Sequence, residues 1–256
     1  MKKQVKVTYL IIVLIMVIQI AVLSVLYTVV STSINENISE STIASMQTMV
    51  TERSQIISNY VNETESYLTA YSRAGEIEAL LLNPTDAKAT KQAQKYTEIF
   101  SADIPNLEGI YVSEWNTHVL AHTNPAVVGM ITREGDSLKA LQNSMMEADG
   151  VYNVGFIFSP ASGKQIVSMY RACYDSNNKP IGLVGGAIYI SGLKDILDSL
   201  PSAGMEHAKY YLVNAVTGEY IFHENEELLG TVAEEAYIKQ IVEAVNGAAS
   251  DVTDYT

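Results

Sequence analysis

Residues Ile110 to Met130 read IYVSEWNTHVLAHTNPAVVGM, and this stretch decides the fold. It opens with β-prone residues, passes a polar turn at Glu114 to Thr117, and resumes with apolar residues up to Ala121. Two apolar runs that flank a short polar link are typical of a β-hairpin. The sequence therefore predicts a hairpin here.

The same pattern returns at Tyr211 to Thr231, which reads YLVNAVTGEYIFHENEELLGT. Aligned without a gap, the two stretches share a histidine, an asparagine, an apolar pair and a closing glycine: His122 with His223, Asn124 with Asn225, Val127-Val128 with Leu228-Leu229, and Gly129 with Gly230. Chance is the alternative, because only a handful of positions are identical. Since the turn, the histidine and the glycine fall in register together, we expect two tandem modules of one fold.

Composition narrows the class of protein. The chain has 256 residues and a formal net charge of -13, which argues against nucleic acid and anionic lipid surfaces as partners. Cys173 is the single cysteine, so no intramolecular disulfide framework is possible. Its strand-like neighbours favour a buried structural thiol. No Cys-Cys or Cys-His metal spacing occurs, and no cofactor is expected.

The N-terminus predicts a membrane anchor. Residues 7–30 read VTYLIIVLIMVIQIAVLSVLYTVV, carry no charge, and are long enough to cross the hydrocarbon core as a helix. A cleaved signal peptide is the alternative, but its apolar core would be shorter and would end in a small-residue cleavage site. The lysines of residues 1–6 are expected to keep that end cytoplasmic, so everything after Ser31 would lie outside the cell membrane.

Residues 31–75 are predicted to form a long stalk helix. From Ile34 to about Ser72 there is no proline or glycine, and apolar residues recur at helical spacing. Such a helix could pack onto its own domain or pair with a second subunit near the membrane. We expect both along its length, and therefore a homodimer.

Residues 76–200 are predicted to form the membrane-distal module, an α+β fold with an antiparallel sheet and helices at its sides. Gly75 and Pro84 break the long helical pattern. The expected elements are then a helix at Asp86–Phe100, the hairpin, a helix at Ser137–Ala148 capped by Asp136, strands at Val151–Phe158, Gln165–Tyr174 and Ile181–Ile190, and a short helix at Gly192–Leu200.

Residues 201–256 are predicted to begin a second, membrane-proximal module after a linker at Pro201 to Gly204. It starts at Lys209, repeats the hairpin, and adds a helix at Glu234–Val245. After the equivalent glycine the first module needs about forty more residues to finish its sheet. The second has nine after Gly247. We therefore expect this module to be truncated, with the rest of it, a second membrane span and a cytoplasmic output part to follow.

At this point the residues resemble a family. The anchor and long helix, the hairpin, the run SPASGKQIVSMYRACYDSNNKPIGLVGGAIYI and the second LVNAVTGEYIFHENEELLG look like the extracellular double Cache sensor region of bacterial chemoreceptors and membrane sensor kinases. The resemblance covers Ile34 to the chain end. It implies a distal PAS-like module that binds a small ligand and a proximal one that relays the change.

The sequence departs from the amino-acid-binding subset of that family, which carries an Arg-Pro-Trp-Tyr cluster after the first hairpin and an aspartate in the last strand. Here the region after Gly129 reads MITREGDSL, with Arg133 the only residue to clamp a carboxylate. Gly186-Ala187-Ile188 stands where the aspartate would fall. A carboxylate, a sugar or another metabolite is therefore at least as good a ligand as an amino acid.

The candidate ligand-binding residues combine aromatic walls with a few polar groups, as small-molecule sites do. Each has a structural alternative: Trp115 could pack on the sheet rim, His122 could hydrogen-bond a backbone carbonyl, and Arg133 could pair with a nearby acid. Tyr170 and Arg171 must point to opposite faces, so only one can face a pocket. The candidates are Tyr111, Trp115, His122, Arg133, Asp136, Tyr152 and Tyr170.

No catalytic pattern stands out. The run from Ser159 to Gln165 lacks the glycine and the hydroxyl of a phosphate loop, His223-Glu224 is not part of an HExxH motif, and no GxSxG elbow occurs. The sequence predicts a sensor without enzyme activity, most simply from a methyl-accepting chemotaxis protein. A histidine kinase or a cyclic-dinucleotide enzyme could equally carry it. A membrane-anchored hydrolase and an ectodomain that binds a protein partner are the rivals from other classes.

Overall fold

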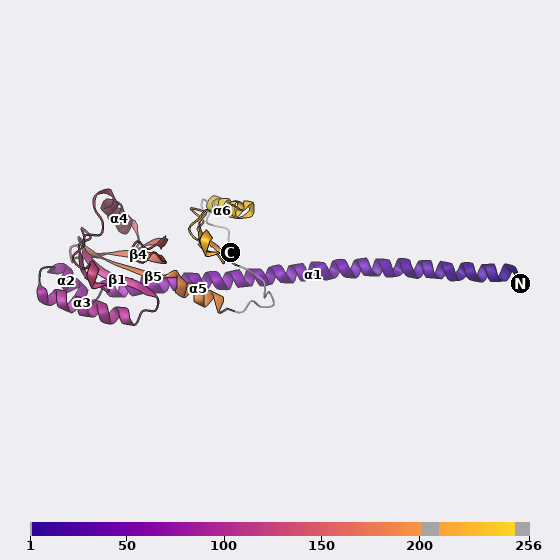
Figure 1. The fold of residues 1–256 in the computed structure, drawn as a ribbon, viewed down its shortest axis with the longest axis horizontal. Helices are drawn as coiled ribbons and strands as arrows, with labels where there is room; N and C mark the ends of the chain where they lie inside the picture. The colour runs from indigo at the N-terminus through magenta and orange to yellow at the C-terminus, as the bar shows by residue number, and fades with distance from the viewer. Residues whose placement is uncertain (1, 201–209, 249–256) are drawn as a thin grey trace. The chain divides into compact units, whose positions relative to one another are not determined.

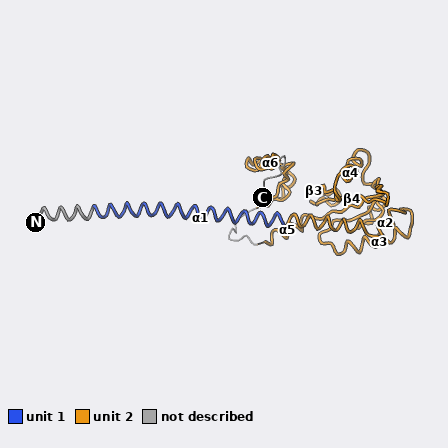
Figure 2. Tube along the Cα trace, turned by 180° about the vertical axis from the view of Figure 1, so that it is seen from behind, with its two compact units in different colours: residues 1–55 blue, residues 56–256 orange. Residues whose placement is uncertain are grey.

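A computed structural model describes residues 2–200 and 210–248. The expected linker at Pro201 to Gly204, the expected module start at Lys209 and the last eight residues lie outside the described part. The chain divides into two compact units, Met1–Gln55 and Ile56–Thr256 (Figure 2). Each is described by itself.

The first unit is helical. It is the N-terminal part of α1 (Lys2–Ser72), a single helix of 71 residues without a break. Its apolar side chains from Leu14 to Val30 are exposed. In the described part of the chain α1 is the one helix long and apolar enough to cross a membrane, and this segment lies near the N-terminus. Exposed leucine, isoleucine and valine in an unbroken run are typical of a helix whose solvent is lipid.

The second unit begins with the C-terminal part of α1 and contains an antiparallel sheet (Figure 1). The sheet has five strands in the order β2-β1-β5-β4-β3, and all neighbouring pairs are antiparallel. The elements in chain order are α2 (Gly75–Leu82), α3 (Ala87–Ala102), β1 (Leu107–Glu114), β2 (Val119–His122), η1 (Pro125–Val127), α4 (Gly135–Glu147), β3 (Val151–Phe158), β4 (Gln165–Tyr174), β5 (Pro180–Tyr189) and α5 (Ile190–Asp198). The predicted α+β class with an antiparallel sheet is confirmed.

Several local expectations need correction. Asp136 does not cap α4, which starts at Gly135 after Glu134 and has no side-chain cap. Asp136 lies in the first turn, where a carboxylate still favours the helix dipole. The sequence reading missed α2, whose buried Ile77 and Leu80 outweigh the glycine at its start. The helix predicted from Asp86 is present as α3, and Asp86 is its N-cap, since its side chain accepts a hydrogen bond from the Lys88 N–H at 2.9 Å.

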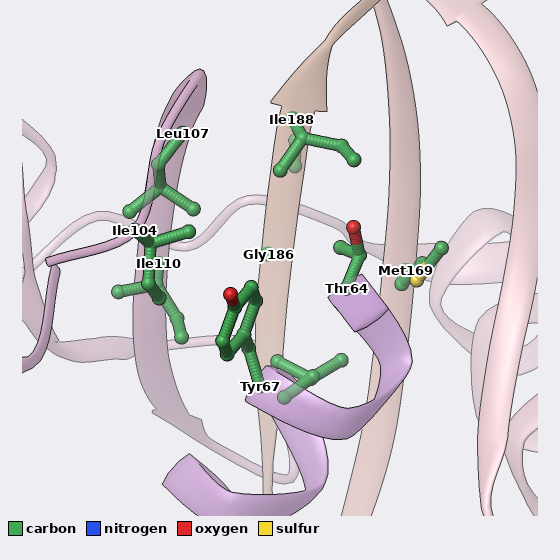
Figure 3. Close-up of a pocket in the computed structure, with 10 residues that line it drawn as sticks. Thr64, Tyr67, Ile104, Leu107, Ile110, Met169, Gly186 and Ile188 are labelled. Atoms are coloured by element: carbon green, nitrogen blue, oxygen red, sulfur yellow. The ribbon is translucent and has the colours of Figure 1, made fainter. Parts of the chain in front are cut away.

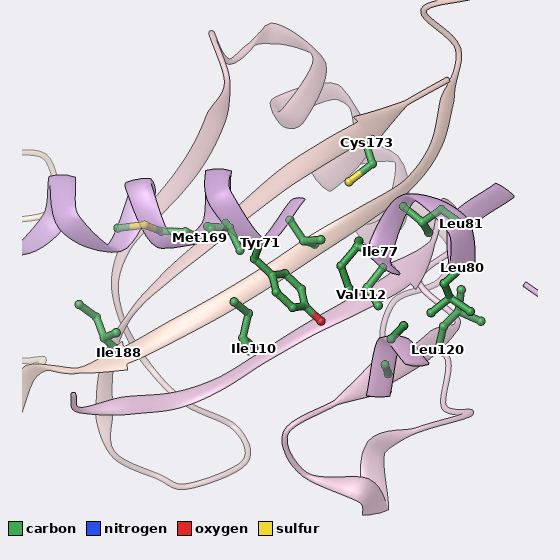
Figure 4. Packing of buried hydrophobic residues seen from close by; sticks show 14 of the residues in the cluster. Tyr71, Ile77, Leu80, Leu81, Ile110, Val112, Leu120, Met169, Cys173 and Ile188 are labelled. Carbon is green, nitrogen blue, oxygen red and sulfur yellow. The ribbon is translucent and has the colours of Figure 1, made fainter. Parts of the chain in front are cut away.

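The sheet separates two clusters of buried side chains. The larger one lies against α1, α2 and α3 and includes Tyr71, Ile110, Met169 and Val184 (Figure 4). The smaller one lies under α4, which covers the opposite face (Figure 1). Alternation along the strands explains the division, because successive side chains point to opposite faces. Tyr71 ties the larger cluster together, since its hydroxyl is 2.6 Å from the Thr97 hydroxyl.

The second hairpin repeats the first in backbone detail. It consists of β6 (Leu212–Val213), β7 (Tyr220–Phe222), η2 (Glu226–Leu228) and α6 (Ala236–Ala248). The interval from His122 to His223 is 101 residues, and at this offset α6 matches α4 end for end. The Gly129 N–H donates to the Val119 carbonyl at 2.8 Å, and the Gly230 N–H donates to the Tyr220 carbonyl at 2.8 Å. The two glycines share the left-handed region, with φ of 86° and 76°. The same peptide geometry is thus built twice.

Candidate ligand-binding site

Four of the seven candidate residues gather under α4. The side chains of Tyr111, Trp115, Tyr152 and Tyr170 pack against a small buried cluster from α4, β4 and β5, which consists of Leu141, Met145, Ala172 and Leu183. All four aromatic residues are half-buried. They come from β1, its turn, β3 and β4, so the sheet register brings together residues far apart in sequence. The result is an aromatic surface that solvent still reaches.

Arg133 joins this surface from the loop before α4. Its Nη2 donates to the Tyr170 hydroxyl at 3.3 Å, and its guanidinium carbon Cζ lies 5.6 Å from the centre of the same ring. Contacts with the phenols of Tyr170, Tyr111 and Tyr152 raise the Arg133 pKa against the opposing effect of burial. Within the described residues Arg133 makes no ion pair with Glu134 or Asp136. The alternative in which Arg133 pairs with a nearby acid is therefore not realised in this part of the chain.

Thr117 holds the backbone of Arg133 in place. Its hydroxyl donates to the Arg133 carbonyl at 3.0 Å and accepts from the Arg133 N–H at 3.0 Å. Thr117 is 1 % exposed and has a φ of 66°, a conformation that β-branched residues rarely adopt. Strain of this kind persists only where the surroundings fix it, and here two hydrogen bonds do so. The sequence pattern gave no sign of this role.

Gly185 leaves space for the Tyr111 ring. The two residues lie opposite each other on β5 and β1, and Tyr170 on β4 faces the same glycine from the other side. A Cβ on Gly185 would lie 2.5 Å from the Tyr111 ring. Burial, with a smaller contribution from the Tyr170 phenol, raises the Tyr111 pKa well above its ordinary value. The Tyr111 phenol therefore stays protonated and can donate a hydrogen bond at neutral pH.

Ser113 carries a buried hydroxyl without a hydrogen-bond partner among the described residues. The residue is 0 % exposed and lies on β1 directly opposite Leu183, which belongs to the cluster under α4. A buried polar atom without a partner is costly, and in native proteins it calls for an explanation such as a water or a ligand. Sequence reasoning missed Ser113, because a serine in a strand is unremarkable until the strand register is known.

His122 has a structural role. Its Nδ1 accepts a hydrogen bond from the Asn124 N–H at 2.7 Å, so its partner is an amide and not the carbonyl expected from the sequence. The Gln94 side chain clamps its backbone, accepting from the His122 N–H and donating to its carbonyl at 3.1 Å each. The ring also stacks on Tyr111, with centroids 5.3 Å apart. Burial lowers the His122 pKa, partly offset by Glu108.

Asp136 is not brought to the cluster. Its side chain is fully exposed, and Oδ1 lies 3.8 Å from Nζ of Lys139 one turn along α4, a weak surface pair. The sequence placed Asp136 near Arg133, but the first turn of α4 directs it to solvent.

A cavity of about 10 Å³ lies away from the aromatic cluster, between α1 and the opposite face of the sheet, near Thr64, Tyr67 and Gly186 (Figure 3). It is nearly all apolar and holds at most one water, so it is a packing defect of the core. Within the described residues, no group of three or more His, Cys, Asp or Glu could hold a metal ion.

Comparison with solved structures identifies the fold of this chain. No family model matches the chain, and no curated protein matches it. Solved sensory domains do share its structure. The sensor domain of the V. cholerae histidine kinase DctB superposes with a TM-score of 0.59 at 11% identity, over 79% of this chain and 74% of that one.

Two structures of a chemoreceptor sensory domain are similar as well. Campylobacter jejuni Tlp3 with isoleucine bound gives a TM-score of 0.59 at 13% identity, over 80% of each chain. Its complex with L-valine gives 0.57 at 14% identity, over 78% of each chain. The chain thus has the Cache-type sensor fold, and the resemblance to double Cache sensor regions predicted from the sequence is confirmed as a fold. These neighbours are sensor domains and not enzymes, in agreement with the absence of catalytic patterns.

Proposed function

We propose that this chain is the extracytoplasmic sensing region of a bacterial transmembrane receptor, in which residues 76–200 form the distal ligand-binding module and residues 201–256 begin the proximal one. The fold, shared with sensor domains of a chemoreceptor and of a kinase, supports the sensing role. A methyl-accepting chemotaxis protein is the preferred output. A histidine kinase is the second candidate, because the DctB sensor domain matches as well as the chemoreceptor domain.

The ligand binds on the α4 face of the sheet, against the aromatic cluster and Arg133. One observation carries this proposal: a half-buried guanidinium that makes a single long hydrogen bond within the described residues, beside the Tyr111 phenol, which can donate. Arginine offers five donors in a planar fork that matches a carboxylate. The free hydroxyl of Ser113 adds a further polar group to the same face.

A carboxylate is the proposed ligand class. The cluster of Tyr111, Trp115, Arg133, Tyr152 and Tyr170 contains no acidic side chain. The α4 face of β5 offers Gly185 and Ala187 where a strand aspartate could stand. An α-ammonium group would therefore lack a charged partner, whereas a carboxylate would find Arg133. Recognition of amino acids, which Tlp3 binds as isoleucine and L-valine, is disfavoured by the same argument.

Binding is transmitted to α1 through the sheet. The α4 face and the α1 face belong to the same three central strands, and Leu68 and Tyr71 of α1 pack on the second of these faces. The Tyr60 hydroxyl donates to the Tyr189 carbonyl at 2.8 Å, where β5 passes into α5. A shift of β5 therefore moves α1. In a homodimer anchored at residues 7–30, the shift crosses the membrane as a small helix displacement.

The test is a thermal-shift screen of the full chain in detergent micelles against succinate, L-isoleucine, glucose and adenine. Ligand that binds the native state raises the melting temperature by mass action. We expect succinate or another carboxylate to raise it and Arg133→Gln to reduce the rise. Lys91→Gln, which removes one positive charge from the exposed surface of α3, is the matched control. If no carboxylate shifts the melting temperature, or if Arg133→Gln leaves the shift unchanged, the proposed site is wrong.

A further inference from the structure

The opposite face of the same module carries a polar groove that the proposed site does not use. It lies between the C-terminal part of α1 and the start of β3, and its volume is about 480 Å³. Four charged side chains line it, two basic and two acidic: Arg73, Arg171, Glu65 and Asp149. Small-molecule sites commonly have volumes of roughly 300–1,000 Å³. The groove therefore has the size of a ligand site.

The position of Arg171 depends on Gly150. Arg171 on β4 lies opposite Val151 on β3, on the face that packs against α1. A Cβ on Gly150 would lie 2.9 Å from Nη1 of Arg171, and Gly150 has a φ of 106°. A side chain at position 150 would be strained and would also displace the guanidinium. The missing side chain thus leaves the space in which Arg171 reaches the groove.

The two arginines of the groove are not neutralised. Within the described residues neither Arg73 nor Arg171 has an ion pair or a side-chain hydrogen bond, although both line the same space as Glu65 and Asp149. Glu65 is already engaged, because its Oε1 accepts from Nδ2 of Asn153 at 3.2 Å. Arg73 is exposed and Arg171 is half-buried, so solvent reaches both guanidinium groups. They leave donors available to an incoming anion.

We propose that this groove is a second ligand site, which binds an oxyanion group, a carboxylate or a phosphate, between Arg73 and Arg171. Guanidinium forks bind both groups through paired charge-assisted hydrogen bonds. The Asp149 carboxylate repels an anion in the groove and therefore lowers the affinity of the site. Because the groove lies between α1 and the sheet, an anion there ties the helix that leads to the membrane directly to the sensor module.

The test is isothermal titration of the full chain in detergent micelles, carried out in an Arg133→Gln background so that the α4 face is removed. Succinate and inorganic phosphate are the two probes, and the one that binds more tightly identifies the source of the oxyanion. We expect Arg73→Gln and Arg171→Gln each to weaken binding by about tenfold. Asp149→Asn should strengthen it, since the repulsion is lost. Lys91→Gln, on the exposed surface of α3, controls for net charge.

Each outcome decides the proposal. The proposal is supported if the arginine variants weaken binding, Asp149→Asn strengthens it and Lys91→Gln leaves it unchanged. The melting temperature of each ligand-free variant should be unchanged. No binding of either probe in the Arg133→Gln background overturns it while leaving the α4-face proposal intact. Binding that is equal in all variants also overturns it, as does binding that depends on protein concentration, which would make the groove a contact between copies of the chain.

Discussion

The two hairpins share their backbone geometry but differ in several side chains. At the offset of 101 residues, the histidine whose Nδ1 accepts a backbone N–H recurs, with distances of 2.7 Å at His122 and 3.0 Å at His223. The asparagine caps of η1 and η2 also recur, each accepting an N–H two residues on at 3.1 Å. Residues that build the scaffold are therefore the ones that repeat.

Three of the candidate ligand residues, Tyr111, Trp115 and Arg133, do not repeat. The position of Tyr111 is taken by Leu212, that of Trp115 by Val216, and that of Arg133 by Glu234. Thr117, which holds Arg133, is replaced by Gly218, which has a φ of 74° and no hydroxyl. The second copy shows what the hairpin requires for folding alone. The difference supports the proposal that Tyr111, Trp115, Thr117 and Arg133 serve ligand binding in the first copy.

The largest effect is expected when Arg133 receives the residue of the second copy. Arg133→Glu replaces the guanidinium by a carboxylate and adds repulsion, so affinity for succinate should fall by at least about a hundredfold. The melting temperature should change little, because the side chain is half-buried and makes one long hydrogen bond. Isothermal titration measures the affinity. Glu234→Arg is the matched control and should bind as the wild type does; a loss there would erase the distinction between the copies.

The second-largest effect is expected at Gly185, which leaves space for the Tyr111 ring. Gly185→Ala places a methyl group 2.5 Å from the Tyr111 ring, and such overpacking costs roughly 1–3 kcal/mol. Denaturant unfolding measures the loss. Gly186→Ala is the control on the other face, since its Cβ would meet Leu68 at an ordinary 3.4 Å.

The double variant Gly185→Ala/Tyr111→Leu tests the cause of that loss. Leucine is the residue of the second copy at this position, and its smaller side chain should recover part of the stability. A strictly additive double variant would show that the ring is not what the methyl group displaces.

A variant of Thr117 tests whether ligand affinity depends on a residue that positions Arg133 without contacting the ligand itself. Thr117→Gly introduces the residue of the second copy, relieves the strain of a positive φ, and removes both hydrogen bonds to the Arg133 backbone. Relief of strain and loss of hydrogen bonds oppose each other, so stability should change little. Affinity for succinate should fall by roughly tenfold, because Arg133 loses its fixed position. Unchanged affinity would mean that the Arg133 side chain is positioned by Tyr170 alone.

The scaffold was predictable because its signals are local. The hairpin, the strands of the sheet and the internal repeat follow from alternation, turn residues and spacing within short windows. The start of α3 near Asp86 was predicted because helix-start signals depend on neighbours two or three residues away. The missed α2 shows the limit, since burial of Ile77 and Leu80 against the rest of the module stabilises a helix that its own sequence does not signal.

The site was only partly predictable because it depends on register. Tyr111, Tyr152 and Tyr170 were placed on strands from the sequence, but their common face required the pairing of β1 with β5 and of β3 with β4. Ser113 and Gly185 were invisible for the same reason: a serine or a glycine in a strand has meaning only through the residue opposite. Thr117 was hidden because its conformation contradicts its propensity.

The smallest expected effect concerns the histidine that both copies share. Burial lowers the His122 pKa below its ordinary value of 6.5, so the unfolded chain takes up a proton at a higher pH than the folded protein does. Stability is then lost as the pH falls below about 6.5, and the loss continues until the folded protein is also protonated. Protonation would in addition remove the Nδ1 acceptor of the Asn124 N–H.

His122→Asn tests this, because an amide oxygen can accept the same hydrogen bond but does not titrate. Between about pH 7.5 and pH 5.5 the melting temperature of the wild type should fall more than that of the variant. Succinate affinity at the higher pH should be the same in both proteins, as expected for a residue that supports the hairpin and does not bind ligand. Parallel pH profiles would show that His122 does not couple folding to pH. A loss of affinity at the higher pH would show that His122 takes part in ligand binding. The second copy would then be a poorer guide to which residues of the first copy only support the fold.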